Sequence, residues 1–172
     1  MATLQTPVNI VVEGAVDNVV MQRLLKYVGL RIGRCLIEGG NRKLIDNLHK
    51  RNAAGHFAPW LVVIDLDDNE CAPAFIRTLL PIEQYNSQFR LRVAVREIEA
   101  WLLADREALA QFLRISINLV PRNPDAEDDP KQVLVNLARR SRNKQLVADI
   151  VPRPESGRRV GPGYLGRITE YI

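Results

Sequence analysis

Short apolar runs alternate with stretches of helical periodicity over the first part of the chain. Apolar runs of roughly four to six residues between polar ones are typical of strands buried on both faces of a parallel sheet. The pattern predicts strands over 8–12, 31–37, 61–64 and 91–95, each followed by a helix. This alternation predicts an α/β fold: a mostly parallel four-stranded sheet with helices on both faces and right-handed crossovers.

The apolar stripes predict which face of each helix is buried. The stripe of the first helix comprises Val16, Val20, Leu24 and Val28, reinforced by Val19 and Leu25. In the second helix, Asn41 is expected to cap the N-terminus. The third is expected over 72–80, and the fourth is a long amphipathic helix that starts at about residue 96. The positions expected to be buried in that long helix are Ile98, Trp101, Leu102, Ala108, Leu109 and Phe112.

The pattern changes after residue 117. Residues 123–129 are acidic and have no periodicity, which indicates a loop. Asp129 and Pro130 are typical of a helix start, with Asp as the cap and Pro in the first turn. Two helices and an irregular basic stretch follow, and a last helix is expected over 164–172. We therefore expect an α/β core over 1–118 and a helical extension over 119–172, packed as one compact domain.

Composition sets the class of protein. The chain has 172 residues, of which 47% are hydrophobic and 26% charged, as in a soluble globular protein. It has no apolar run of roughly 18 residues, which a membrane helix needs. The first residues lack the pattern of a signal peptide, so a cytoplasmic location is expected. Cys35 and Cys71 fit no metal-ligand spacing, and a reducing compartment disfavours a disulfide between them.

The positive charge is concentrated near the C-terminus. Residues 139–167 include eight basic and two acidic residues, a net charge of +6, so the rest of the chain carries −2. Such a segment is either a solvated basic surface or a footprint for nucleic-acid phosphates. Lys43, beside a glycine turn, is likewise either an ordinary surface lysine or a phosphate contact. The candidate nucleic-acid contacts are Lys43, Lys131, Arg139, Arg140, Arg142, Arg158 and Arg159.

Acidic residues follow three of the predicted strands. They are Glu13 after the first, Asp65, Asp67 and Asp68 after the third, and Glu97 and Glu99 after the fourth. Neighbouring strands are about 4.8 Å apart, so acids at their carboxyl ends are able to share an ion. A ligand set of oxygens without His or Cys suits Mg²⁺ or Mn²⁺. For any single strand, the simpler interpretation is a strand that runs into a solvated turn.

Two of these segments carry a resemblance to a known family. Glu13-Gly14-Ala15-Val16-Asp17 resembles the E-G-x-x-D opening of the Toprim domain, and Asp65-Leu66-Asp67 resembles its D-x-D motif. The resemblance implies that Glu13 is a general acid or base, that Asp65 and Asp67 bind the metal, and that Asp17, Asp68, Glu97 and Glu99 are auxiliary ligands. The residues after the D-x-D segment, Asp68-Asn69-Glu70, lack the glycine that many Toprim proteins have there, and no active-site tyrosine motif is evident.

Three later segments are similar to a small family of stand-alone Toprim-like proteins. They are Arg96 to Asp105, Asp129-Pro130-Lys131 and Val160-Gly161-Pro162-Gly163-Tyr164. Members of that family are often encoded beside ATPases, some in loci linked to phage defence. The resemblance therefore implies a partner ATPase.

Two functional hypotheses follow. The first is metal-dependent cleavage of phosphodiester bonds in nucleic acid. The alternative is a non-catalytic module that senses nucleic acid or a nucleotide and works with a partner ATPase. A haloacid-dehalogenase-like phosphatase is disfavoured, because its D-x-D-x-T motif lies on the first strand and needs threonine where this chain has Asn69.

Overall fold

The computed structural model describes residues 6–69, 71–81 and 85–172. The chain divides into two compact units, one that ends at Ala94 and one that runs from Val95 to Ile172. The sequence suggested a division after residue 118 instead. The helices over 99–113 belong to the second unit, where α5 (Glu99–Ala104) packs against α7 (Pro130–Arg139).

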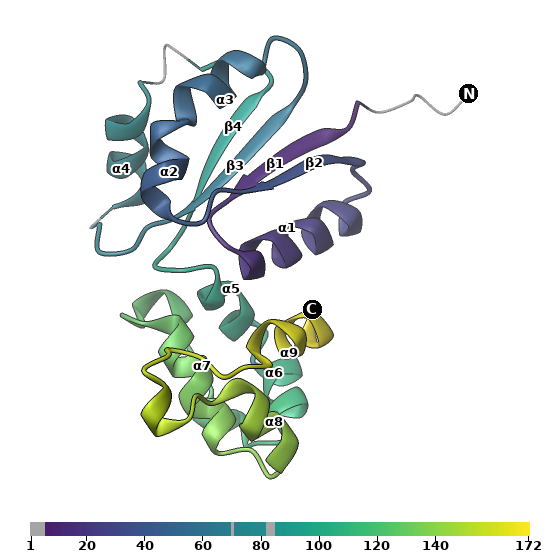
Figure 1. The fold of residues 1–172 in the computed structure, drawn as a ribbon, viewed down its shortest axis with the longest axis vertical. Helices are drawn as coiled ribbons and strands as arrows, with labels where there is room; N and C mark the ends of the chain where they lie inside the picture. The colour runs from purple at the N-terminus through teal and green to yellow at the C-terminus, as the bar shows by residue number, and fades with distance from the viewer. Residues whose placement is uncertain (1–5, 70, 82–84) are drawn as a thin grey trace. The chain divides into compact units, whose positions relative to one another are not determined.

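The first unit is built on a four-stranded sheet in which all strands are parallel. The strands are β1 (Val8–Val12), β2 (Ile32–Ile37), β3 (Trp60–Asp65) and β4 (Phe89–Ala94). Their order is β2-β1-β3-β4, so β1 and β3 are central (Figure 1). The predicted α/β class is confirmed, and each predicted strand lies within a few residues of its observed position.

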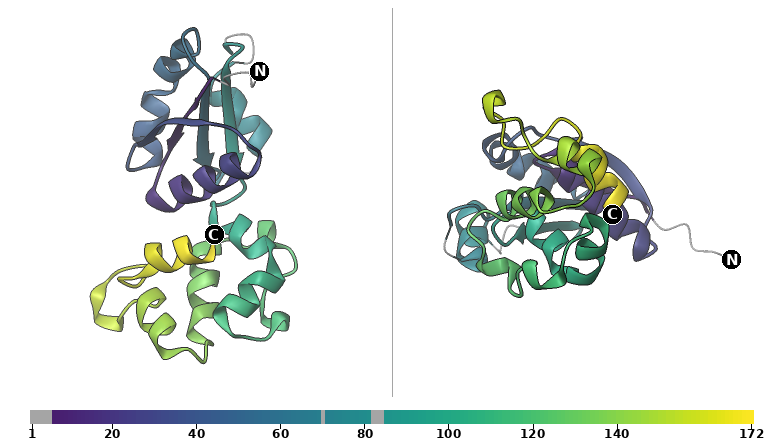
Figure 2. Two further views of the ribbon diagram at one scale, coloured as in Figure 1. Left: turned by 90° about the vertical axis from the view of Figure 1, so that its right-hand side faces the viewer. Right: turned by 90° about the horizontal axis from the view of Figure 1, so that it is seen from below.

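Helices cover both faces of this sheet. They are α1 (Ala15–Tyr27), α2 (Asn41–Asp46), α3 (Leu48–Ala54) and α4 (Ala72–Leu79). In Figure 1 and the left view of Figure 2, α1 lies on one face, and α2, α3 and α4 lie on the other. The predicted third helix is confirmed as α4, which ends just before Leu80 and Pro81.

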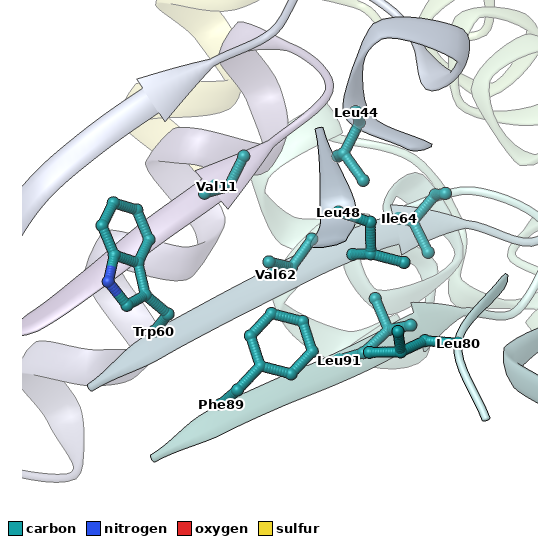
Figure 3. Close-up of a cluster of buried hydrophobic side chains, with 9 residues drawn as sticks. All are labelled: Val11, Leu44, Leu48, Trp60, Val62, Ile64, Leu80, Phe89 and Leu91. Atoms are coloured by element: carbon teal, nitrogen blue, oxygen red, sulfur yellow. The ribbon is translucent and has the colours of Figure 1, made fainter. Parts of the chain in front are cut away.

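The main core of the first unit lies under α2, α3 and α4. Val62 on β3 pairs with Val11 on β1 and with Leu91 on β4, so these side chains form one row across the sheet. The row packs against Leu44 and Leu48, as Figure 3 shows. Both leucines are 1% exposed. Because strand residues alternate between faces, this row fixes which side chains point away from the core.

The predicted stripe of α1 is only partly correct. The buried residues are Asp17, Val20, Met21 and Leu25, whereas Leu24 is 41% exposed and Val28 62% exposed. Residues spaced by four turn about 400° around a helix, so a strict i, i+4 stripe drifts by about 40° per step. Over three steps from Val16 to Val28, that drift carries the stripe off the buried face.

The second unit is helical among its described residues. Its elements are α5, α6 (Arg106–Leu113), η2 (Ile117–Leu119), η3 (Pro124–Ala126), α7, α8 (Lys144–Ile150), η4 (Pro154–Ser156) and α9 (Tyr164–Tyr171). Helix α8 packs against both α7 and α9, and Leu134, Ile150 and Ile168 are fully buried. The cap predicted at Asp129 is confirmed, since its Oδ1 accepts from the Gln132 amide at 2.8 Å.

The long helix predicted from residue 96 is broken into α5 and α6. Asp105 lies between them, and its side chain accepts a hydrogen bond from the Ala108 amide at 3.0 Å. This cap starts a new helix in a new direction. The prediction of burial is confirmed for Ile98, Leu102 and Leu109. Trp101, Ala108 and Phe112 are instead partly exposed.

No helix within the described ranges is both long enough and apolar enough to cross a membrane.

Candidate functional site

The acids that follow β1 and β3 lie together in the first unit. The two strands pair in parallel, with Val11 beside Val62, so both chains leave the sheet at the same edge. Glu13 Oε1 accepts a hydrogen bond from the backbone amide of Asp65 at 2.9 Å. Asp65 itself is largely buried. The sequence prediction that these two residues meet is therefore supported by a direct contact.

Asp17 lies close to the same strand end. It is 6% exposed, although it occupies the first turn of α1. A Cβ atom placed on Gly14 would lie 3.0 Å from Asp17 Oδ2. The absent side chain at Gly14 therefore gives this carboxylate room beside the backbone that follows Glu13. A carboxylate at this position also interacts favourably with the helix dipole.

Asp67 and Asp68 are exposed in the turn that follows β3. Asn69 closes the turn, because its backbone amide and its side-chain amide both donate to the Leu66 carbonyl, at 3.0 and 2.8 Å. Asp67 has a φ of 49°, in the left-handed region that Asp and Asn tolerate better than most residues. The turn thus holds Asp67 in a defined backbone conformation next to Asp65.

Asn41 links this turn to the loop that follows β2. Its Nδ2 donates to Asp67 Oδ2 at 2.9 Å. The expectation that Asn41 caps α2 is wrong, because the cap residue is Gly40 and no side chain bonds there. Gly39 and Gly40 have φ values of 75° and 138°, which only glycine adopts readily, so this tight loop brings Asn41 to the acidic turn.

The donor set of this region is made of carboxylate oxygens, which is the chemistry that Mg²⁺ and Mn²⁺ prefer. No group of three acidic, His or Cys side chains in the described part of the chain is arranged to hold a metal ion. Mg²⁺ commonly binds through one or two carboxylates and takes its other ligands from water and substrate phosphates. Asp65 and Asp67 are carboxylates of the kind that this mode of binding uses, and Glu13 is bonded to the Asp65 amide. The metal itself stays a prediction.

Glu97 and Glu99 lie in the second unit, where basic side chains hold them. Lys131 Nζ lies 3.4 Å from Glu97 Oε1 and 3.5 Å from Glu99 Oε1. The Lys131 backbone amide donates to Glu97 Oε2 at 3.2 Å, and Arg159 Nη1 lies 3.7 Å from Glu97 Oε1. Their predicted role as auxiliary metal ligands stays a prediction, but their contacts within this unit already give them a structural role.

Glu99 is the most deeply buried acid of the described residues. It is 1% exposed and accepts a hydrogen bond from the Tyr164 hydroxyl at 3.1 Å. Burial raises the pKa of Glu99 above its ordinary value, and the nearby Lys131 ammonium opposes that rise. Burial and the adjacent Glu99 carboxylate also raise the pKa of Tyr164. Tyr164 therefore remains a hydrogen-bond donor at neutral pH.

Three segments that the resemblance singled out meet in this cluster. The segment of Arg96 to Asp105 contributes Glu97 and Glu99, that of Asp129 to Lys131 contributes Lys131, and that of Val160 to Tyr164 contributes Tyr164. Arg159 adds a second link, because its Nη2 lies 2.6 Å from Asp129 Oδ2. The cluster ties the start of α5 to the starts of α7 and α9.

The candidate nucleic-acid contacts fall into two groups. Lys131 and Arg159 form the ion pairs described above, so their charges are partly neutralised within the protein. The other five are exposed, and none of them forms an ion pair with another described residue. They are Lys43 on α2, Arg139, Arg140 and Arg142 at the end of α7, and Arg158. The basic end of the chain therefore has fewer available cations than its sequence suggests.

Arg158 and Arg153 line one surface pocket of about 470 Å³ in the second unit. The loop between them is held by Ser156, whose hydroxyl donates to the Arg153 carbonyl at 2.7 Å and accepts from the Arg158 amide at 3.3 Å. Gly157 has a φ of 63°, which lets the loop turn back. The loop thus presents two arginines to the same pocket.

Sequence reasoning missed three residues of these regions: Asn41 as a partner of Asp67, Tyr164 as a partner of Glu99, and Arg153 as a neighbour of Arg158. The contacts of Asn41 and Tyr164 join segments far apart in the chain, whereas Arg153 and Arg158 are brought to one pocket by the local turn at Gly157. The one available signal was Tyr164, an aromatic residue with a polar group directly after a glycine turn.

No protein-family model, curated protein or solved structure matches the chain. The structure itself defines the class of the first unit, an α/β fold on a four-stranded parallel sheet.

Proposed function

We propose that this protein cleaves phosphodiester bonds of nucleic acid with the help of Mg²⁺ or Mn²⁺, in the cytoplasm. The observation that carries the proposal is the contact between Glu13 Oε1 and the Asp65 amide, which brings the acids of two neighbouring strand ends together. Asp67 follows in an ordered turn, and Asp17 lies beside the same strand end. The resemblance to the Toprim motifs supports the same roles for these residues.

Each side chain then has a defined task. Asp65 and Asp67 would hold the divalent cation, and Glu13 would accept a proton from the attacking water or return one to the leaving oxygen. When bound, the cation stabilises negative charge on the phosphate oxygens. The exposed arginines, Arg158 among them, would bind the phosphate backbone without reading its sequence.

A second candidate is a non-catalytic module that senses nucleic acid or a nucleotide and works with a partner ATPase. One observation favours it: the Glu13 carboxylate already accepts the Asp65 amide, and this bond extends the β1–β3 pairing by one step. A carboxylate with that structural role is less available as a base.

The test of the proposed activity is a cleavage assay on single- and double-stranded DNA and RNA, each with Mg²⁺ and with Mn²⁺. Wild-type protein should cleave at least one substrate, and Asp65→Asn should lower the rate by at least about 100-fold, as expected for loss of a group that acts in the transition state. Asp46→Asn is the matched control, because Asp46 is an exposed acid of the same unit. Wild-type protein that binds nucleic acid without cleaving it would support the sensing module instead.

A binding titration separates the two neighbouring arginines. Arg158→Ala should flatten the slope of log affinity against log salt by about 0.9 on duplex DNA, because one phosphate contact is lost. Arg159→Ala should leave that slope unchanged and reduce stability by less than about 1 kcal/mol, since its ion pair with Asp129 is partly exposed. If Arg159→Ala flattens the slope and Arg158→Ala does not, Arg159 leaves its ion pairs to bind phosphate.

A further inference from the structure

A second pocket of about 470 Å³ lies in the first unit at the outer edge of the sheet. Strand β4 is an edge strand, and the pocket lies between it and α4. Its lining includes three arginines, two aromatic residues and one aliphatic residue that are able to contact a ligand: Arg77, Arg90, Arg92, Tyr85, Phe89 and Ile76. Neither the acidic region nor the motifs of the sequence account for this concentration of positive charge.

Backbone carbonyls position Arg90 and Arg92, and no described carboxylate pairs with the three arginines of the pocket. Arg90 Nη1 donates to the carbonyls of Ser87 and Phe89, at 2.9 and 2.7 Å, and Arg92 Nη1 donates to the Leu91 carbonyl at 2.9 Å. These carbonyl partners are uncharged, and a guanidinium has five N–H donors, so each arginine keeps donors for another group. Within residues 6–69, 71–81 and 85–172, no carboxylate forms an ion pair with Arg77, Arg90 or Arg92.

Tyr85 supplies an independent sign of a ligand. Its hydroxyl is buried and has no hydrogen-bond partner in the described part of the chain. Its ring packs against Phe89, with 5.7 Å between the ring centroids. Burial raises the pKa of Tyr85, and the nearby positive charge of Arg92 opposes that rise. Buried polar groups in native proteins are nearly always bonded, so this hydroxyl calls for an acceptor or donor that the described residues do not provide.

The chemistry of the pocket matches a phosphorylated ligand with an apolar part. Guanidinium groups bind phosphate through paired N–H donors, and a tyrosine hydroxyl is able to donate to a phosphate oxygen. Ile76 and Phe89 add an apolar wall suited to a sugar or base. A volume of about 470 Å³ lies within the range of small-ligand sites. We propose that this pocket binds a 5′-phosphorylated nucleoside, either a free mononucleotide or the 5′ end of a nucleic acid.

None of the acids of the acidic region lines this pocket. On β4 the lining ends at Arg92, which pairs with Val63, whereas Ala94 pairs with Asp65. The lining therefore ends two residues before the level of Asp65, about 7 Å at about 3.3 Å per residue. The inference does not rest on the proposed cleavage activity, so either can fail without the other.

The test is a calorimetric titration of the full chain with adenosine 5′-monophosphate. Wild type should bind the nucleotide at least about 10-fold more tightly than adenosine, because the phosphate faces three arginines. Arg92→Gln and Arg77→Gln should each weaken binding by about 10-fold. Arg34→Gln is the matched control, since it removes an exposed arginine from β2, at the other edge of the same sheet, and should leave the affinity unchanged.

Tyr85→Phe is the most discriminating variant. It keeps the ring contact with Phe89 and removes only the hydroxyl that lacks a partner. Its melting temperature without ligand should be equal to that of wild type or higher, whereas its affinity for the nucleotide should fall several-fold. A variant that melts earlier and binds as well as wild type would overturn the role of the hydroxyl.

A second titration distinguishes the source of the phosphate. It compares a 5′-phosphorylated oligonucleotide with the same strand carrying a 5′-hydroxyl. A preference for the phosphorylated strand that Arg92→Gln abolishes would assign the pocket to nucleic-acid ends, and binding of the mononucleotide alone would assign it to free nucleotides. Equal binding of adenosine and adenosine 5′-monophosphate, or no binding of any of these probes at millimolar concentration, would overturn the proposal.

Discussion

Acidic side chains gather in both units, and the two groups are held in different ways. In the first unit, Glu13 accepts from the Asp65 backbone amide and Asp67 from the Asn41 side-chain amide. In the second unit, Glu97 and Glu99 share the Lys131 ammonium. The printed contacts of the first group come from neutral amides, whereas those of the second group include a charged ammonium.

The difference shows why the same sequence signal has two outcomes. In both units the acids closely follow a strand in the sequence, so the sequence predicted that all of them belong to one site. In the second unit, however, Lys131 and Tyr164 arrive from distant segments and bond the acids. Acids that follow a strand in the sequence therefore do not by themselves distinguish a site from a structural cluster, because the partners from distant segments decide between them.

The largest expected effect is the loss of Lys131. Lys131→Met would leave Glu99, which is 1% exposed, without its cation. Breaking a buried ion pair from one side costs about 3 kcal/mol or more, because a buried charge is left uncompensated. Urea denaturation at neutral pH measures this loss. Lys144→Met, an exposed lysine of α8, is the control and should change the free energy of unfolding by less than about 0.5 kcal/mol.

A smaller effect is the pH dependence that Glu99 imposes on stability. Its pKa is raised in the folded protein by burial, so the folded state holds this proton more tightly than the unfolded state does. The stabilisation that this bound proton gives the folded state is fully present below the ordinary pKa of 4.5. It is lost as the pH rises through the folded-state pKa of Glu99. Glu99→Gln does not titrate, so its stability relative to wild type should improve between about pH 4 and pH 8.

Thermal or urea unfolding of both proteins across this range checks the sign. Glu107→Gln is the control, since Glu107 is exposed on α6 and its removal should give a curve parallel to that of wild type. If the difference between Glu99→Gln and wild type is the same at pH 4 and pH 8, Glu99 does not titrate differently in the folded state.

The smallest expected effect concerns Asp67 in the first unit. Asp67→Asn keeps an oxygen for the Asn41 amide and tolerates the left-handed backbone at this position. It also removes one like charge from a region that contains Asp65 and Asp68. In the presence of a chelator, its free energy of unfolding should lie within about 0.5 kcal/mol of wild type. A loss above about 1 kcal/mol would mean that the Asp67 carboxylate itself stabilises the fold.

The regular elements were largely predictable because they depend on local patterns. The strands, the Asp129 cap and the end of α4 before Pro81 follow from neighbouring residues alone. The break at Asp105 was not predicted, because an apolar stripe continues across it and only the cap geometry reveals it. That Glu13 and Asp65 end at one edge was predictable from a parallel sheet, but their direct contact also needs β1 and β3 to be neighbours, which only the structure shows.

The partners of Glu99 and Asp67 were not predictable in the same way. Tyr164 and Glu99 are 65 residues apart, and Asn41 and Asp67 are 26 apart. No periodicity connects residues at such separations. The three arginines of the β4 pocket gave no signal either, because Arg90 and Arg92 look like the solvent face of an alternating strand.

The turn at Gly161 and Gly163 limits how this protein can vary. Both residues donate from their backbone amides to carbonyls at the end of α8, Gly161 to Ile150 at 2.8 Å and Gly163 to Asp149 at 2.9 Å. A Cβ atom on Gly161 would overlap the Asp149 carbonyl, and one on Gly163 would lie 2.6 Å from Asp149 Cβ. In a library that samples every amino acid, both positions should retain glycine alone, while the exposed Pro162 between them should accept many residues.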